Sequence, residues 1–221
     1  MKPALLLFDL DGTLSDPGEG ITKSVQYALL KMGIREPDLK KLEGFVGPPL
    51  QVSFAERYSF SEQEVERAVS YYRERFIEKG MFENKVYDGI PKLLSGLKQE
   101  GYKLAVATSK PSVFAEEILK FFQIERFFDF VAGSSLDGKG ASKTEIILSV
   151  MNHFQGVHKE EMVMIGDRKH DIIGAVNTGI RSIGVTYGYG SMEELEEACP
   201  SVLVSSVEEL KRLLLKNTVQ L

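Results

Sequence analysis

Short runs of consecutive apolar residues recur along the chain and alternate with segments of helical periodicity. The first run covers residues 4–8 and is followed by the turn-prone pair Asp11-Gly12. Five similar runs cover residues 104–107, 130–132, 162–165, 182–185 and 202–204. Continuous apolar runs of this length are typical of parallel strands that are buried on both faces of a sheet.

The segments between these runs place apolar residues three and four positions apart, as one face of a helix requires. Ile90, Leu93, Leu94 and Leu97 have this spacing, and residues 114–122, 146–151, 172–176 and 207–214 repeat it. Alternation of strand and helix predicts an α/β protein with a doubly wound parallel sheet.

One long segment departs from this alternation. Residues 17–85 have helical periodicity only, with one stripe at Ile21, Val25, Ala28 and Leu29. A segment of this length does not fit a simple crossover between strands, so we predict an inserted helical domain. The domain boundaries expected from the sequence are 1–16 and 86–221 for the α/β core, and 17–85 for the insert.

Composition and charge narrow the class of partner. The formal net charge is −5, which argues against a surface for a nucleic acid polymer, because such surfaces need clustered Lys and Arg. No apolar run approaches the roughly 18 residues of a membrane span. Cys199 is the only cysteine, so no intramolecular disulfide can form. We therefore expect a cytoplasmic protein that acts on a small molecule.

Carboxylates follow two of the predicted strands. Asp9 and Asp11 come directly after the first strand, and Asp167 and Asp171 come after the fourth. The carboxyl ends of parallel strands meet at one edge of a sheet, where ligands bind. Clustered carboxylates repel one another unless a cation holds them, and their hard oxygen atoms suit Mg²⁺. A simple turn at Asp11-Gly12 and a helix N-cap at Asp167 or Asp171 are the alternatives.

Hydroxyl and ammonium groups are expected at the same edge. Thr108 and Ser109 follow the second strand and open a predicted helix, a geometry that suits an anion. Lys110 comes next, and Lys143 is placed near the start of a later helix. Either lysine could bind a phosphate or balance a carboxylate, although most lysines are solvated surface charges.

These residues together resemble the haloacid dehalogenase-like superfamily, specifically its phosphatases. The run Phe8-Asp9-Leu10-Asp11-Gly12-Thr13-Leu14 resembles the first of four family motifs. Thr108 resembles the second, Lys143 the third, and Gly166-Asp167 with Asp171 the fourth. The resemblance covers the whole chain, and it implies a Rossmann-like core with a helical cap of type C1, as in the phosphoglycolate phosphatase and 5′-nucleotidase branch.

The resemblance implies a phosphomonoester hydrolase with an aspartyl-phosphate intermediate on Asp9. Asp11 would act as general acid and then general base. The Mg²⁺ ion would be held by the Asp9 side chain, the Asp11 backbone carbonyl and Asp167. Asp171 would support the water shell of the metal or orient Lys143. The phosphate would be bound by residues of the first three motifs and their neighbours: Gly12, Thr13, Thr108, Ser109, Lys110 and Lys143.

Single residues separate related activities in this superfamily. Dehalogenases lack a carboxylate at the position of Asp11, and hexose-phosphate mutases usually have Val in place of Thr13, so hydrolysis is favoured. A phosphosugar mutase or an inorganic pyrophosphatase of the same fold stays an alternative. A non-hydrolytic phospho-accepting regulatory domain is the alternative from a different class.

The sequence leaves the substrate open. Lys23, Lys41 or Arg57 of the insert could bind the carboxylate of phosphoglycolate. Phe45, Phe54 or Tyr58 could instead stack on a nucleobase, although packing between helices is the more common role of such residues. Of these we place only Lys23 among the substrate-binding residues, and we expect a monomer or homodimer. Residues 187–191, Tyr-Gly-Tyr-Gly-Ser, are predicted to be a plain connection between a strand and a helix.

Overall fold

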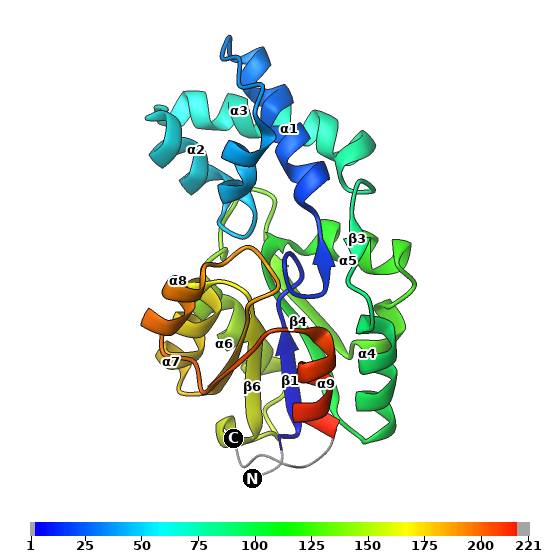
Figure 1. The fold of residues 1–221 in the computed structure, drawn as a ribbon. Helices are drawn as coiled ribbons and strands as arrows, with labels where there is room; N and C mark the ends of the chain where they lie inside the picture. Colours follow the sequence, from blue (N-terminus) through cyan, green and yellow to red (C-terminus); the bar gives the residue numbers. More distant parts are fainter. Residues whose placement is uncertain (1–2, 216–221) are drawn as a thin grey trace. The chain divides into compact units, whose positions relative to one another are not determined.

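Six parallel strands form the central sheet of the protein, in the order β5-β4-β1-β6-β7-β8 (Figure 1). The computed structural model describes residues 3–215. The strands are β1 (Leu5–Phe8), β4 (Lys103–Pro111), β5 (Phe130–Ser134), β6 (Met162–Gly166), β7 (Arg181–Val185) and β8 (Val202–Val204). All six predicted strands are present, and the doubly wound parallel sheet is confirmed. The chain runs outward through β4 and β5 on one side of β1 and through β6, β7 and β8 on the other, so a ligand site is expected at the carboxyl end of β1.

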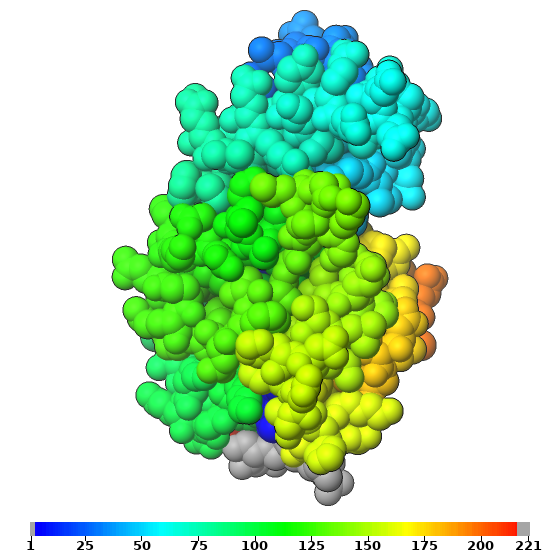
Figure 2. Space-filling model, turned by 180° about the vertical axis from the view of Figure 1, so that it is seen from behind, coloured from blue at the N-terminus to red at the C-terminus, as the bar shows by residue number. Residues whose placement is uncertain are grey.

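Helices connect these strands. They are α4 (Ile90–Gln99), α5 (Ser112–Phe121), α6 (Lys143–His153), α7 (Lys169–Thr178), α8 (Met192–Glu197) and α9 (Val207–Leu215), with short 3₁₀ helices η3 (Glu125–Phe127) and η4 (Lys159–Glu161). Leu5 and Leu7 share a core cluster with Ile146 and Ile147 of α6. Side chains alternate across a strand, so Leu6 lies on the other face, where it is equally buried. In Figure 2 the darkest blue, which marks the start of the chain, appears only as a small patch among green and yellow atoms, as expected when the first strand is central.

The second strand is longer than the sequence predicts. β4 continues through Lys110 to Pro111, with an irregular register against β5 between Ala107 and Pro111. Helix α5 begins only at Ser112. The prediction that Thr108 and Ser109 open a helix is therefore wrong, because a bulged extension of the strand separates them from it.

Residues 16–85 form a second compact unit, and the first unit contains the rest of the described chain. β2 (Ser15–Asp16) and β3 (Lys85–Val86) form a two-stranded sheet where the chain passes from one unit to the other. The other elements of the second unit are α1 (Gly18–Lys31), the 3₁₀ helix η1 (Leu39–Phe45), α2 (Leu50–Tyr58), α3 (Glu62–Arg75) and the π-helix η2 (Phe76–Gly80).

Helix α1 is central to this second unit, because it contacts α3, η1 and η2. Its predicted apolar stripe, which includes Val25 and Leu29, is fully buried. Phe45 and Phe54 are also buried, with ring centroids 4.9 Å apart in an edge-to-face arrangement. These two aromatic residues therefore belong to the interior of the unit. No helix within residues 3–215 combines the length and apolarity that crossing a membrane requires.

Candidate active site

Asp9 is the first residue after β1 and is nearly completely buried. Its backbone N–H donates to the carbonyl of Ile165 on β6 at 2.9 Å, which continues the sheet by one residue. Its side-chain Oδ1 accepts a hydrogen bond from the backbone N–H of Leu10 at 2.8 Å. These main-chain contacts hold the carboxylate at the carboxyl end of the central strand.

A tight turn after Asp9 brings Asp11 to the same edge of the sheet. The backbone N–H groups of Leu14 and Ser15 both donate to the carbonyl of Leu10, and Gly12 has a φ of +83°, which favours glycine. Asp11 Oδ2 then lies 2.8 Å from the ammonium of Lys110. Burial raises the pKa of Asp11 above its ordinary value, although the charge of Lys110 acts in the opposite direction.

Lys143, the first residue of α6, places its ammonium among three acceptors. Nζ lies 2.8 Å from the carbonyl oxygen of Ala107, 3.0 Å from Asp9 Oδ1 and 2.8 Å from Asp171 Oδ1. The contact with Ala107 is a hydrogen bond, and the contacts with the two carboxylates are ion pairs. Burial on its own would lower the pKa of Lys143, but the charges of Asp171 and Asp9 raise it above its ordinary value. Lys143 is therefore a buried cation.

Asp167 and Asp171 complete a cluster of three buried carboxylates with Asp9. One oxygen from each residue lies within 4.8 Å of the other two. Burial, together with the charges of Asp171 and Asp9, raises the pKa of Asp167 well above its ordinary value. Burial also raises the pKa of Asp171 to about 6, despite the nearby Lys143. Three acids face one ammonium in this cluster, so its charge is not balanced.

The cluster fits a divalent cation such as Mg²⁺. The three donors are hard carboxylate oxygens at a spacing that one ion can span. Asp11 Oδ1, next to the cluster in sequence, is buried without a hydrogen-bond partner. Gly166 leaves room for the Asp171 side chain, because a Cβ atom at Gly166 would lie 2.2 Å from the carboxyl carbon of Asp171. A metal ion would supply the missing positive charge.

The structure also assembles the predicted hydroxyl groups, but with different contacts. Thr108 is buried, and its Oγ1 accepts a 3.3 Å hydrogen bond from the backbone N–H of Lys110. Ser109 Oγ donates to the carbonyl of Ala141 at 3.0 Å, which ties β4 to the loop before α6. Thr13 Oγ1 donates to Asp167 Oδ1 at 3.4 Å. Their expected contacts with phosphate stay predictions.

Lys23 belongs to the second unit. Its ammonium lies 2.6 Å from Glu19 and 3.5 Å from Glu83, and both acids are in the same unit. The predicted role of Lys23 in binding substrate is not tested by these contacts.

Sequence reasoning did not assign a site role to residues 187–191. The segment connects β7 to α8, as predicted, but the backbone N–H of Tyr189 also donates to Asp167 Oδ2 at 2.7 Å. The hydroxyl of Tyr187 donates to the carbonyl of Thr13 at 3.0 Å. The two glycines that alternate with tyrosines were the available signal, because glycine permits close approach of backbone to a neighbour.

Comparison with known proteins identifies the class. Residues 6–185 match the model of a family described as haloacid dehalogenase-like hydrolase. The chain therefore belongs to this family, as its four motifs suggested.

Proteins of similar sequence or structure indicate what kind of enzyme this family member is. A 5′-nucleotidase of Pseudomonas aeruginosa is 49% identical over 209 residues, which cover 95% of this chain and 94% of that protein. The tyrosine-protein kinase PtkA of Mycobacterium tuberculosis is 36% identical, over 96% of this chain and 73% of its own length. A crystal structure of a predicted phosphatase from Clostridium acetobutylicum is 51% identical, with a TM-score of 0.94 over 98% of this chain and all of that one. The protein is an enzyme, a phosphatase of this family.

Replacement of Lys143 by Met tests the charge balance of the site. In metal-free buffer we expect Lys143→Met to lower the free energy of unfolding by about 3–5 kcal/mol, because Asp9 and Asp171 stay buried without their cation. Urea denaturation measures this loss. The control is Lys139→Met, which removes an ammonium that is paired with Asp137 but is 87% exposed, so little change is expected. Equal stability of both variants would contradict the role of Lys143 as the counter-charge.

Proposed function

We propose that this phosphatase is a Mg²⁺-dependent phosphomonoester hydrolase with Asp9 as its nucleophile. The observation that supports this most directly is the position of the Asp9 carboxylate, 3.0 Å from the buried ammonium of Lys143 and within the cluster that contains Asp167. A carboxylate with a neighbouring cation can accept the approach of an anionic phosphate. Without a neighbouring cation, the same carboxylate would repel the phosphate.

Hydrolysis proceeds in two displacements at phosphorus. In the first, a bond forms between an Asp9 oxygen and phosphorus, the bond to the leaving oxygen breaks, and Asp11 gives that oxygen its proton. In the second, water attacks the same phosphorus, Asp11 accepts a proton from the water, and the Asp9–phosphorus bond breaks. Burial raises the pKa of Asp11, which favours the protonated form that the first displacement requires.

Other residues of the site position the phosphoryl group. Asp9, Asp167 and the Asp11 backbone carbonyl would hold a Mg²⁺ ion, which would supply positive charge next to the oxygens of the phosphoryl group. Asp171 keeps Lys143 in place through a 2.8 Å ion pair and belongs to the same acidic cluster. Phosphate oxygens are bound by Lys143 and by the hydroxyl of Thr108, with the Gly12–Thr13 turn and the Ser109–Lys110 segment around them.

The substrate is a small phosphoester, and we propose that nucleoside monophosphates are tested first. The similarity to a 5′-nucleotidase extends over nearly the whole chain, which supports this choice. We propose that the helical insert, residues 17–85, acts as a cap that selects the substrate, with Lys23 as one of its binding residues. Phosphoglycolate, sugar phosphates and pyrophosphate are the other candidates.

Turnover of p-nitrophenyl phosphate tests the central proposal. We expect many turnovers per enzyme in the presence of Mg²⁺, none after chelation with EDTA, and none for Asp9→Asn, because an amide is a poor nucleophile. Colorimetric detection of both p-nitrophenol and inorganic phosphate distinguishes hydrolysis from transfer to another acceptor, the activity in the name of PtkA. Stoichiometric rather than repeated release would instead favour a phospho-accepting regulatory domain.

The acid–base role of Asp11 has its own test. Asp11→Asn retains the size of the side chain but cannot donate or accept the proton, so we expect kcat to fall about 10²–10⁴-fold. Asp137→Asn removes an exposed carboxylate outside the site and should leave kcat unchanged. A normal kcat for folded Asp11→Asn would contradict the role, and steady-state kinetics on nucleoside monophosphates measures it.

A further inference from the structure

Asp167 has no exposed surface and is enclosed by segments that are far apart in the sequence. The hydroxyl of Thr13 donates to its Oδ1 at 3.4 Å, and the backbone N–H of Tyr189 donates to its Oδ2 at 2.7 Å. Both oxygens of this carboxylate are therefore oriented by donors on loops that follow β1 and β7.

Two glycines of the second loop allow this approach. A Cβ atom at Gly188 would lie 2.4 Å from the Cβ of Asp167 and 2.4 Å from the carbonyl oxygen of Gly12. A Cβ atom at Gly190 would lie 2.0 Å from the carbonyl oxygen of Asp167. Neither glycine has a positive φ, so neither position needs a backbone conformation that favours glycine. Close packing against Asp167 is what excludes a side chain at both positions.

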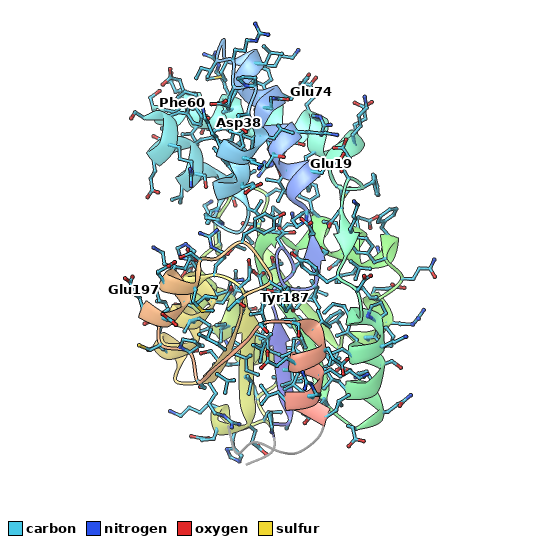
Figure 3. All side chains as sticks on the ribbon, in the orientation of Figure 1. Glu19, Asp38, Phe60, Glu74, Tyr187 and Glu197 are labelled. Carbon is cyan, nitrogen blue, oxygen red and sulfur yellow. The ribbon has the colours of Figure 1, made fainter. Side chains whose placement is uncertain are left out.

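Tyr187 ties the same loop to the turn after Asp9. Its hydroxyl donates to the carbonyl of Thr13 at 3.0 Å, and its ring packs edge to face on Tyr87 at 5.1 Å. Figure 3 labels Tyr187 near the carboxyl end of β1, where the turn begins. The loop thus contacts the Gly12–Thr13 turn and Asp167 at the same time.

We propose that residues 187–190 are a positioning element of the metal site. These residues hold Asp167 and the Gly12–Thr13 turn in the arrangement that binds the ion. This inference rests on the proposed function. The donors to Asp167 limit rotation of its carboxylate, and the hydrogen bond from Tyr187 limits movement of the turn that contains Asp11. Residues that orient metal ligands in this way commonly change metal affinity or activity 10–100-fold when they are replaced.

The first test is a matched pair of tyrosine replacements. Tyr187→Phe removes one hydroxyl that donates to a backbone carbonyl. Tyr102→Phe removes another, which lies outside the site and donates to the carbonyl of Leu214 at 2.9 Å. We expect Tyr187→Phe to raise the dissociation constant of Mn²⁺ about tenfold, and Tyr102→Phe to leave it at the wild-type value. Electron paramagnetic resonance of free Mn²⁺ measures both constants without substrate.

The second test is a matched pair of glycine replacements. Gly188→Ala introduces a Cβ atom against Asp167, whereas Gly156→Ala introduces one into open space on the same unit. We expect Gly188→Ala to weaken Mn²⁺ binding by at least tenfold and to raise the Mg²⁺ concentration needed for half-maximal turnover by a similar factor. Gly156→Ala should match the wild-type protein in both. Circular dichroism shows whether each variant is folded.

The outcomes separate this inference from the proposed function. Wild-type Mn²⁺ affinity in both Tyr187→Phe and folded Gly188→Ala would overturn the positioning role while leaving the hydrolase intact. If Gly188→Ala does not fold, the comparison of Tyr187→Phe with Tyr102→Phe decides. A wild-type protein that binds no divalent metal would overturn the proposed metal dependence and, with it, the inference.

Discussion

The charge balance around one buried ammonium is the constraint on which the site depends. Lys143 faces Asp9 and Asp171 at 3.0 Å and 2.8 Å in a region with almost no exposed surface. Removing a carboxylate from water is costly unless a cation and hydrogen bonds replace the water. One ammonium cannot balance Asp9, Asp167 and Asp171 together, and burial, with repulsion from the neighbouring carboxylates, raises the pKa of both Asp167 and Asp171. A divalent cation held by these carboxylates would supply the missing positive charge, which is why the proposed function includes a metal ion.

The parallel sheet explains why these groups meet. Asp9 continues β1, Asp167 follows β6, and Lys143 donates to the backbone of β4, the other neighbour of β1. Asp9 and Asp167 therefore start from the carboxyl ends of two adjacent strands, and Lys143 reaches the same edge of the sheet from the first residue of α6. Because both faces of β1 are buried, the strand ends are held rigidly, and short loops suffice to place the side chains. The chemistry is concentrated where the strand order reverses, as expected for open α/β sheets.

Much of the fold and of the site could be predicted from the sequence, because strands, helices and short motifs leave local patterns in it. The six strands, the helical insert and the start of a helix near Lys143 are examples. That Lys110 pairs with Asp11 in particular could not be predicted, because this contact depends on the irregular extension of β4 to Pro111. The role of Tyr187 and Gly188 was missed for a similar reason. Their partners, Thr13 and Asp167, lie far away in the sequence, and only the folded sheet brings β1, β6 and β7 side by side.

The covalent step on Asp9 is the central claim, and mass spectrometry tests it most directly. Wild-type enzyme and Asp11→Asn are mixed with Mg²⁺ and p-nitrophenyl phosphate, whose leaving group departs without a general acid, and the mixtures are then quenched in acid and digested. A phosphoryl group that is removed by hydroxylamine should be found on the peptide that contains Asp9, with greater occupancy in Asp11→Asn, whose hydrolysis step is slowed. A phosphoryl group on a different residue, or turnover with no phosphorylated peptide in either protein, would contradict the account.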